Sequence, residues 1–205
     1  MPYRVNSYYF SLIKTLFDLL FGIFVLFFTF PILILISIII LLTAGYPFTF
    51  TQKRVGKNGK VFLIYKFRTM YVGADKQQQK LKDLNQAPGP MFKIFDDPRF
   101  VGIGKFLSRT GLDELPQLFN ILKGEMSFVG PRPLPVNEVK KLSSVWDFRN
   151  EVKPGIFSEW TLASNRHDSL TDWKELDKKT LSHGGLSYDL KLIFLTLKKS
   201  LRAIN

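Results

Sequence analysis

The sequence predicts a mostly helical α+β fold in which an N-terminal membrane anchor carries one membrane-associated domain. A stretch from Leu19 to Gln52 contains no charged residue, a segment rich in β-branched and aromatic residues follows it, and amphipathic helical patterns occur further along the chain. With 205 residues the chain has room for one sizeable domain beside the anchor. We therefore divide it into an anchor over residues 1–50 and a domain over residues 51–205.

The anchor is predicted from a long apolar run. The segment from Leu19 to Leu42 is almost wholly apolar and exceeds the roughly 20 residues that a helix needs to span a bilayer. It is too long for a cleavable signal, and no small-residue cleavage pattern follows it, so we expect it to stay in the mature protein. Pro31 lies in its middle and predicts a kink, because proline lacks the backbone N–H and clashes with the preceding turn.

Basic residues stand on both sides of this apolar run. Two precede it, Arg4 and Lys14. Four follow it closely: Lys53, Arg54, Lys57 and Lys60. A single crossing favours asymmetric flanks, whereas a helix that breaks at Pro31 and returns leaves both flanks on the cytoplasmic side. We therefore favour a re-entrant helix-break-helix, with a straight span as the alternative.

The domain is expected to begin with extended chain. The segment from Lys60 to Met70 is rich in β-branched and aromatic residues and predicts a strand. The polar segment from Asp75 to Leu84 permits a helix, and Pro88-Gly89-Pro90 ends it with a loop.

Further helices are expected in the second half. A helix that starts near Asp113 and stops at Gly124 is predicted because apolar residues recur at i, i+3, i+4 and i+7, namely Leu115, Leu118, Phe119 and Leu122. The segment from Val136 to Trp146 is expected to form another helix.

The C-terminal segment carries a second membrane signal. Apolar residues lie along one helical face, and basic residues lie off it: Leu190, Ile193, Phe194, Leu197 and Leu201 against Lys191, Lys198, Lys199 and Arg202. This pattern is typical of an interfacial amphipathic helix. A soluble helix that packs its apolar face on the domain explains the pattern about equally well, and the anchor at the other terminus favours the membrane surface.

The composition limits the classes of ligand and of chemical site that this protein can have. The 29 Lys and Arg against 17 Asp and Glu give a net charge of +12, which favours nucleic acid, anionic lipid or phosphate-bearing substrates. Cysteine is absent, which excludes disulfides, thiol nucleophiles and thiolate metal sites, and two histidines argue against a multi-histidine metal site. No nucleic-acid reading motif is recognisable, so nucleic acid is not an expected partner.

The most informative stretch is Arg109-Thr-Gly-Leu-Asp-Glu-Leu-Pro-Gln117. Asp113 and Glu114 begin the predicted helix, where acidic residues are common because they complement the free N–H groups and the helix dipole. The same helix end suits a phosphate, and Arg109 adds a cation. A carboxylate held there would stay ionised and could bind a divalent cation or attack phosphorus. From the residues alone, helix capping and chemistry both stay open.

Two more groups of basic side chains are candidates for binding a phosphate group. The turn Gly130-Pro-Arg-Pro133 holds Arg132 between prolines, which would fix its two-donor fork. Lys66 and Arg68 occupy alternate positions of the predicted strand and therefore share one face. A rigid turn and a solvated strand face are the structural alternatives.

Five blocks, in order, carry a family resemblance: Lys66-Phe-Arg-Thr-Met70, Asp97-Pro-Arg99, Arg109-Thr-Gly-Leu-Asp-Glu-Leu-Pro-Gln-Leu-Phe-Asn120, Ser127-Phe-Val-Gly-Pro-Arg-Pro133 and Lys153-Pro-Gly-Ile156. Together they resemble the bacterial sugar transferases, the monotopic polyprenyl-phosphate phosphoglycosyl transferases. The resemblance runs from the hydrophobic segment to the last helix. The chain is similar to the minimal form, because larger members carry additional N-terminal spanning helices.

The resemblance implies a re-entrant helix broken at Pro31 and a catalytic domain on the cytoplasmic face of the bacterial inner membrane. It also implies a covalent ping-pong reaction in the first membrane step of glycan assembly. Asp113 would attack the β-phosphate of a UDP-sugar and release UMP, and a polyprenyl phosphate such as undecaprenyl phosphate would then take the sugar-1-phosphate. Mg²⁺, with Asp113 among its ligands, would offset the charge of the diphosphate.

The resemblance also assigns supporting roles. Glu114 would orient the nucleophile or neutralise charge beside it, and Arg132 would hold a phosphate. Lys66, Arg68 and Arg109 are further expected phosphate contacts. The segment Phe157-Ser-Glu-Trp-Thr-Leu-Ala-Ser-Asn-Arg166 departs from the usual family run, although its Trp160 and Arg166 remain. We expect Arg166 to contact substrate, and the lost glycines to alter nucleotide or sugar recognition.

One alternative comes from another class of protein. A non-catalytic, membrane-anchored basic protein that binds anionic lipid or scaffolds an assembly fits the anchor and the charge, but predicts no nucleotide turnover. Membrane lipids are expected contacts under either interpretation, and a homodimer is compatible with the sequence.

Overall fold

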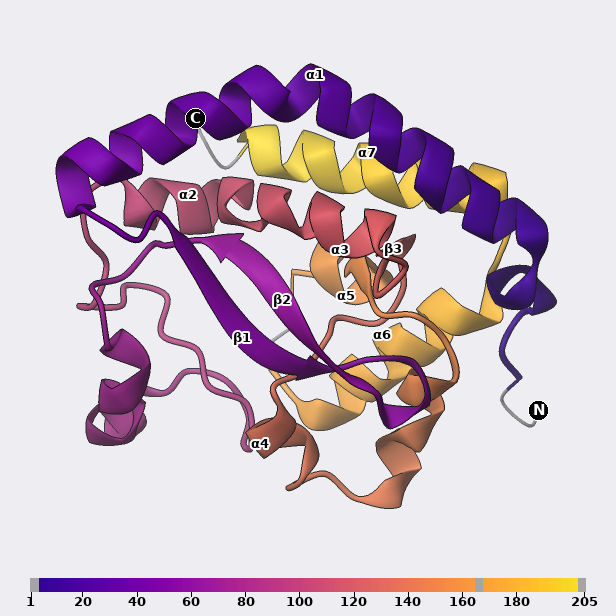
Figure 1. Ribbon diagram of the computed structural model, residues 1–205. Helices are drawn as coiled ribbons and strands as arrows, with labels where there is room; N and C mark the ends of the chain where they lie inside the picture. Colours follow the sequence, from indigo (N-terminus) through magenta and orange to yellow (C-terminus); the bar gives the residue numbers. More distant parts are fainter. Residues whose placement is uncertain (1–3, 165–167, 203–205) are drawn as a thin grey trace.

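The computed structural model describes residues 4–164 and 168–202. Helices dominate it, and two small two-stranded sheets complete the fold, which confirms the predicted mostly helical α+β class. Figure 1 shows a long arched helix, α1, above a layer that contains α2, α3 and α7. The β1–β2 hairpin and the segments from α4 to α6 lie on the other side of that layer.

Helix α1 (Leu12–Ala44) is long and apolar enough to cross a membrane. It follows a short 3-10 turn, η1 (Ser7–Phe10). Ser11 begins α1, because its hydroxyl oxygen accepts a hydrogen bond from the Lys14 N–H at 3.2 Å. Gly45 ends it at φ 78°, a left-handed conformation that suits glycine.

Helix α1 stays helical through Pro31. The sequence predicts a break there, whereas the chain forms one continuous, arched helix (Figure 1). Proline removes a single N–H donor, and the hydrogen bonds on either side continue, so the helix bends without unwinding. In the turn before the proline, the Thr29 hydroxyl donates to the Val25 carbonyl at 2.8 Å.

The two ends of α1 are both attached to the domain. Near the N-terminal end, the buried Lys14 Nζ lies 3.0 Å from Asp18 Oδ1 and 2.7 Å from Asp189 Oδ2 of α7. Asp18 Oδ1 also accepts hydrogen bonds from Ser127 Oγ and the Phe128 N–H, both at 3.1 Å. Lys14 is therefore part of a buried ion cluster and not the free basic flank that the sequence argument assumes.

At the other end, the Arg68 guanidinium donates to the Ala44 and Gly45 carbonyls at 2.5 and 2.6 Å. Beside this end, a buried apolar cluster joins α1 to the domain: Leu33, Ile36 and Ile40 pack with Phe67 and Leu107. Large apolar side chains on the remaining faces of α1 are exposed.

The hairpin pairs β1 (Thr49–Val55) with β2 (Val61–Phe67) in antiparallel register, through the turn η2 (Lys57–Gly59). The strand β2 confirms the strand predicted over Lys60–Met70. The strand β1 was not predicted, because its polar and basic residues were interpreted as the charged segment that follows the anchor. It crosses the boundary that the sequence argument sets at residue 50.

A parallel pair, β3 (Ser127–Val129) and β4 (Gly155–Phe157), brings the Gly-Pro-Arg-Pro turn beside Lys153-Pro-Gly155. The backbones touch closely here, since a Cβ on Gly155 would lie 2.1 Å from the Gly130 nitrogen. Only glycine permits this approach. The resulting contact fixes the start of the turn that carries Arg132.

The middle of the chain is built from short helical pieces. They are η3 (Ala74–Leu84), α2 (Gly104–Thr110), η4 (Leu112–Gln117), α3 (Leu118–Leu122), α4 (Val136–Val139), η5 (Ser144–Glu151) and α5 (Glu159–Leu162). The predicted helix from Asp113 is confirmed as η4 and α3 together, with a 3-10 first part that accommodates Pro116. The single helix predicted over Val136–Trp146 is wrong, because α4 ends at Val139 and η5 begins only at Ser144.

Two longer helices end the chain. The helix α6 (Leu170–Ser182) was not predicted, and α7 (Leu186–Arg202) was. In α7, Leu192 and Ile193 are buried in the core, whereas Leu190, Phe194 and Leu197 are exposed. The helix thus packs one side on the domain, as the soluble alternative predicts, and leaves a neighbouring apolar stripe uncovered, so contact with a membrane surface stays a prediction.

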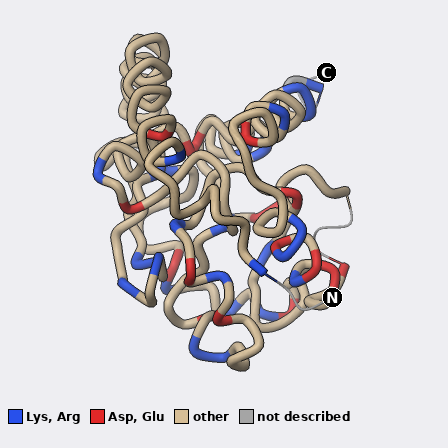
Figure 2. The backbone as a smooth tube through the Cα atoms, turned by 90° about the vertical axis from the view of Figure 1, so that its right-hand side faces the viewer, with Lys and Arg blue, Asp and Glu red and all other residues tan. Residues whose placement is uncertain are grey.

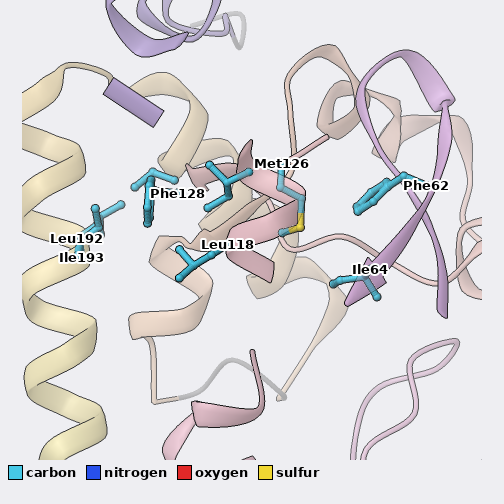
Figure 3. Close-up of a cluster of buried hydrophobic side chains, with 9 residues drawn as sticks. Phe62, Ile64, Leu118, Met126, Phe128, Leu192 and Ile193 are labelled. Atoms are coloured by element: carbon cyan, nitrogen blue, oxygen red, sulfur yellow. The ribbon is translucent and has the colours of Figure 1, made fainter. Parts of the chain in front are cut away.

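The main core joins the hairpin to α3, β3 and α7. Figure 3 shows side chains of this cluster converging between these elements. It consists of Phe62, Ile64, Leu118, Ile121, Met126, Phe128, Val129, Leu192 and Ile193. Side chains from the first half of α1 pack against it, so α1 and the hairpin share one core. Figure 2 shows the charged residues spread over the body of the molecule, whereas α1 carries almost none.

Candidate active site

Asp113 and Glu114 lie in the first turn of η4, which packs directly against β2. Gly111 separates α2 from η4 at φ 77°, and this left-handed residue lets the chain reverse direction before the two acids. Lys66 approaches from β2, and Arg132 approaches from the turn after β3. The structure therefore brings together four of the residues that the sequence selects.

These four side chains form one ion network. Lys66 Nζ lies 2.6 Å from Glu114 Oε1 and 3.3 Å from Asp113 Oδ2. Arg132 reaches Glu114 with both terminal nitrogens, Nη2 to Oε1 at 2.8 Å and Nη1 to Oε2 at 3.4 Å. Glu114 thus uses both carboxylate oxygens on cations. Among the residues that the structure describes, Asp113 has one such contact, through Oδ2, which leaves Oδ1 uncommitted.

The two carboxylates differ in acidity. Burial disfavours the charged form of both, but Arg132 and Lys66 outweigh burial at Glu114 and hold its pKa far below the usual range. At Asp113 burial dominates, the neighbouring Glu114 adds to it, and Lys66 compensates only in part, so the pKa is raised. The sequence predicts an ionised carboxylate stabilised at a helix end. The structure instead gives Asp113 a poorly stabilised anion.

A cavity of about 320 Å³ opens beside this network, and we call it the first cavity. Asp113, Glu114 and Arg132 line it together with Trp160 and Trp173. Further basic residues on its wall are Arg54, Lys66, Lys93, Arg109 and Lys199. A site with this many cations and two indole rings suits a ligand that combines phosphates with a flat ring.

A second cavity, of about 340 Å³, lies on the hairpin side of Asp113. Its wall runs from Pro47, just after α1, along the hairpin to Val72 and Gln78. Four residues line both cavities: Arg54, Lys66, Ser108 and Asp113. The nucleophile candidate therefore stands where the two cavities meet.

Arg132 is supported from behind. Arg149 donates through Nη2 to the Arg132 carbonyl and through Nε to Asp177, both at 2.7 Å. The Arg132 guanidinium lies 5.5 Å from the centre of the Trp160 ring, which in turn stacks on Trp173 at 4.6 Å. These contacts fix both the backbone and the fork of Arg132.

Sequence reasoning missed Arg149 and Asp177. Both are buried, and they come from different helices of the second half of the chain, η5 and α6. Arg54 was read only as a flank charge, although it lines both cavities and donates to the Pro133 carbonyl at 2.9 Å. Burial and the nearby Arg132 lower the pKa of Arg54 to about 10. No local pattern marks these residues, because their partners are distant in sequence.

The other candidate site residues predicted from the sequence lie outside this ion network or outside the described residues. Arg109 lines the first cavity, but its side chain is more than half exposed and contacts Asp96 at 3.5 Å. Arg68 lines the second cavity, while its guanidinium holds the end of α1. Their expected phosphate contacts stay predictions. Arg166 lies outside the described residues.

A divalent cation fits the chemistry of the donors. Mg²⁺ is usually held by one or two carboxylates together with substrate phosphates. Asp113 offers a free oxygen at the cavity wall, whereas both oxygens of Glu114 are occupied by cations. Within the described residues no group of three or more His, Cys, Asp or Glu side chains is placed to hold a metal by itself. A metal here would therefore depend on Asp113 and on the phosphates of a substrate.

An acidic pair, a basic clamp and a cavity rich in cations form a class of site suited to phosphate-bearing ligands. The chain belongs to the bacterial sugar transferase family, whose model matches residues 9–203. The family resemblance found in the sequence is thereby confirmed. The match includes α1 and continues into α7, so the long apolar helix is part of the family unit.

The names of similar proteins agree with this assignment. The chain is 45% identical over 157 residues to the galactosyl transferase CpsE of Streptococcus agalactiae, covering 75% of this chain and 34% of that protein. It is 36% identical over 199 residues to the undecaprenyl-phosphate galactose phosphotransferase of Salmonella typhimurium, with 93% and 40% covered. It is 32% identical over 188 residues to the exopolysaccharide production protein ExoY of Sinorhizobium fredii, with 90% and 83% covered. The chain thus spans well under half of the first two relatives and most of the third.

Proposed function

We propose that this protein transfers a sugar-1-phosphate from a UDP-sugar to a polyprenyl phosphate, with Asp113 as the nucleophile. The observation that carries the proposal is the difference between the two acids: Glu114 is locked by two cations, whereas Asp113 has an uncommitted oxygen at the meeting point of two cavities. The names of the relatives support the acceptor, since one of them is an undecaprenyl-phosphate phosphotransferase.

The first half of the proposed reaction forms a covalent intermediate. An Asp113 carboxylate oxygen attacks the β-phosphorus of the UDP-sugar, and the bond to the bridging oxygen breaks, so its electron pair leaves with UMP. The raised pKa of Asp113 favours attack, because a poorly stabilised anion is a better nucleophile. Arg132 and Lys66 stabilise the charge that develops on the phosphates.

In the second half an oxygen of the polyprenyl phosphate attacks the same phosphorus. The bond to Asp113 breaks, the carboxylate is restored, and a polyprenyl diphosphate sugar forms. Glu114 keeps Lys66 and Arg132 in place through both halves. Mg²⁺ bound through Asp113 and the substrate phosphates would supply further charge neutralisation.

The proposal places the site at the cytoplasmic face of the bacterial inner membrane, with α1 re-entrant. Two contacts support this arrangement: the Lys14 cluster joins the start of α1 to the domain, and Arg68 joins its end to the same domain. A straight crossing would have to break one of these attachments. Exposed apolar side chains on the outer faces of α1 suit a shallow position in the bilayer.

The test of the nucleophile uses no acceptor. Incubation with a panel of UDP-sugars and Mg²⁺ should release UMP in an amount limited by the enzyme, and the protein should gain the mass of one sugar-phosphate at Asp113. Asp113→Asn keeps the shape and the capping ability of the side chain, so the protein should fold while the adduct disappears. Glu114→Gln should slow adduct formation without moving its site.

Three results would contradict the proposal. An adduct that maps to Glu114 would mean that the other carboxylate attacks. UMP release that strictly requires polyprenyl phosphate would replace the covalent route by direct transfer. The absence of nucleotide turnover with any donor would favour the membrane-anchored scaffold instead.

A further inference from the structure

The two cavities that meet at Asp113 differ in their charge. The first cavity is lined by six basic residues: Arg54, Lys66, Lys93, Arg109, Arg132 and Lys199. The second has Arg54 and Lys66 in common with it and adds only Arg68 and Arg99. These two arginines are already engaged, Arg68 with the end of α1 and Arg99 with Asp97 and the Ala74 carbonyl. Away from the shared residues, the first cavity therefore presents four basic residues to a phosphate and the second presents two, although Arg132, Arg109 and Lys199 of the first cavity have partners as well.

The cavities also differ in the apolar groups behind them. Trp160 and Trp173 of the first cavity belong to a cluster drawn from the loops and helices between Ala87 and Leu176, without any residue of α1. Phe67 of the second cavity belongs to the cluster that contains Leu33 and Ile36 of α1. Pro47, at one end of its wall, lies three residues after the end of α1. No residue of α1 is among its described lining, but Pro47 and Phe67 place the second cavity nearer to the C-terminal half of α1 than the first cavity.

The chemistry restricts where the two phosphates lie. In each in-line displacement the incoming and leaving oxygens stand on opposite sides of phosphorus. UMP leaves opposite Asp113 in the first half, and the acceptor must attack opposite Asp113 in the second. The acceptor phosphate therefore takes the place that the UMP phosphate has left, at the shared wall formed by Lys66 and Arg54. Only the parts beyond these phosphates, the nucleoside of the donor and the isoprenoid chain of the acceptor, can occupy different cavities.

We propose that the nucleoside of the donor occupies the first cavity, and that the isoprenoid chain of the polyprenyl phosphate leaves the shared phosphate position through the second cavity toward α1. This inference rests on the proposed function and adds a separate path for the lipid. It explains why a site beneath a membrane helix needs two openings. The lipid reaches Asp113 from the bilayer side while the nucleotide enters from the polar side.

Two neighbouring glutamines of η3 supply a matched test. Gln78 is half buried and lines the second cavity, whereas Gln79 is exposed and lines neither cavity. Gln78→Glu and Gln79→Glu add the same charge with almost the same shape. A carboxylate in the second cavity should repel the phosphate end of the lipid and disfavour its apolar chain, so Gln78→Glu should raise the KM for polyprenyl phosphate by about fivefold or more. Gln79→Glu should keep the wild-type KM.

The half-reactions separate the two substrates. The rate of acceptor-free UMP release and its KM for UDP-sugar should be the same in both variants, while transfer from the preformed adduct to polyprenyl phosphate should slow only in Gln78→Glu. A raised KM for UDP-sugar in Gln78→Glu would overturn the inference, because the second cavity would then hold part of the donor. An unchanged KM for polyprenyl phosphate would overturn it as well.

A photolabel tests the lipid path without any turnover. Polyprenyl phosphate with a diazirine on the isoprene unit next to the phosphate should label peptides from residues 47–52 or 69–78 of the wild-type protein in detergent. Labelling confined to residues 91–93, 132–135 or 196–200 would place the chain in the first cavity and refute the inference. This result holds whether or not Asp113 forms an adduct, so the two proposals fail in distinguishable ways.

Discussion

Asp113 and Glu114 have different surroundings although they are adjacent in the chain. A 3-10 helix has three residues per turn, so neighbouring side chains diverge by about 120°. In η4 this directs Glu114 to Arg132 and Lys66 together, and leaves Asp113 with Lys66 alone. The division between an acid held by two cations and an acid with an uncommitted oxygen therefore follows from the different directions in which the two side chains leave η4.

Arg132 offers a test of geometry at the residue scale. Lysine keeps the charge but lacks the planar fork that reaches Glu114 with two nitrogens and lies over Trp160. Arg132→Lys should therefore lower kcat/KM for UMP release by about tenfold to a hundredfold. Thermal unfolding in detergent should change little. A stability loss that parallels the activity loss would mean that Arg132 is mainly a structural part of its turn.

Asp177 predicts an effect of pH on stability. Burial raises its pKa to about 6, because desolvation outweighs the attraction of Arg149. Between about pH 4 and pH 6 the folded protein keeps this proton and the unfolded chain has released it, so the stability contributed by the site falls as pH rises. The total change is about 3 kcal/mol. Thermal unfolding from pH 4 to pH 7 should show this slope in the wild type.

The matched variant for that slope is Asp177→Asn, which cannot titrate. Its overall stability should be lower, since Arg149 loses its buried partner. Its midpoint should nevertheless vary less with pH than that of the wild type between pH 4 and pH 6. Equal pH dependence in both proteins would show that Asp177 is not the group that titrates.

At the scale of elements, the attachment of α1 depends on three buried charges. Lys14 bridges Asp18 of its own helix and Asp189 of α7. Lys14→Met leaves both carboxylates buried without their cation and should cost about 3–5 kcal/mol of stability. Replacing all three residues together, by Lys14→Met, Asp18→Asn and Asp189→Asn, should recover part of that loss. Lys53→Met, at an exposed position of β1, is the control, and an equal loss there would remove the special role of Lys14.

The sequence predicts elements well where a pattern is local. The apolar run, the strand near Lys66 and the periodicity after Asp113 all describe contacts within a few residues, and the structure contains each of these elements. The helix predicted after Val136 is interrupted, and α6 was missed because its apolar positions face a tryptophan cluster assembled from separate segments.

The candidate site shows the same limit. Asp113, Glu114, Arg132 and Lys66 could be chosen because each stands in a recognisable block. Their mutual contacts, the support from Arg149 and the second cavity depend on chain segments that are distant in sequence. The Lys14–Asp189 pair joins residues 175 positions apart, so the sequence alone assigned Lys14 to the wrong environment.

At the scale of the whole molecule, apolar and charged surfaces are separated. Exposed apolar side chains gather on α1 and on one stripe of α7, while the charged residues spread over the remaining body (Figure 2). Both cavities meet at Asp113, the first beside the Arg132 turn and the second along the hairpin. Such a molecule suits the proposed position at one membrane surface, where the proposed lipid acceptor and nucleotide donor would meet at Asp113.

The last prediction concerns the membrane topology that this arrangement requires. The chain has no cysteine, so single cysteines can be introduced at the exposed Ser7, before α1, and Thr51, after it, without background. Because both ends of α1 are attached to one domain, both cysteines should resist an impermeant thiol reagent in intact cells and react after lysis. Labelling of Ser7→Cys alone in intact cells would demonstrate a straight span. Pro31→Leu restores the missing N–H donor and should straighten the arch, which strains one attachment and lowers thermal stability.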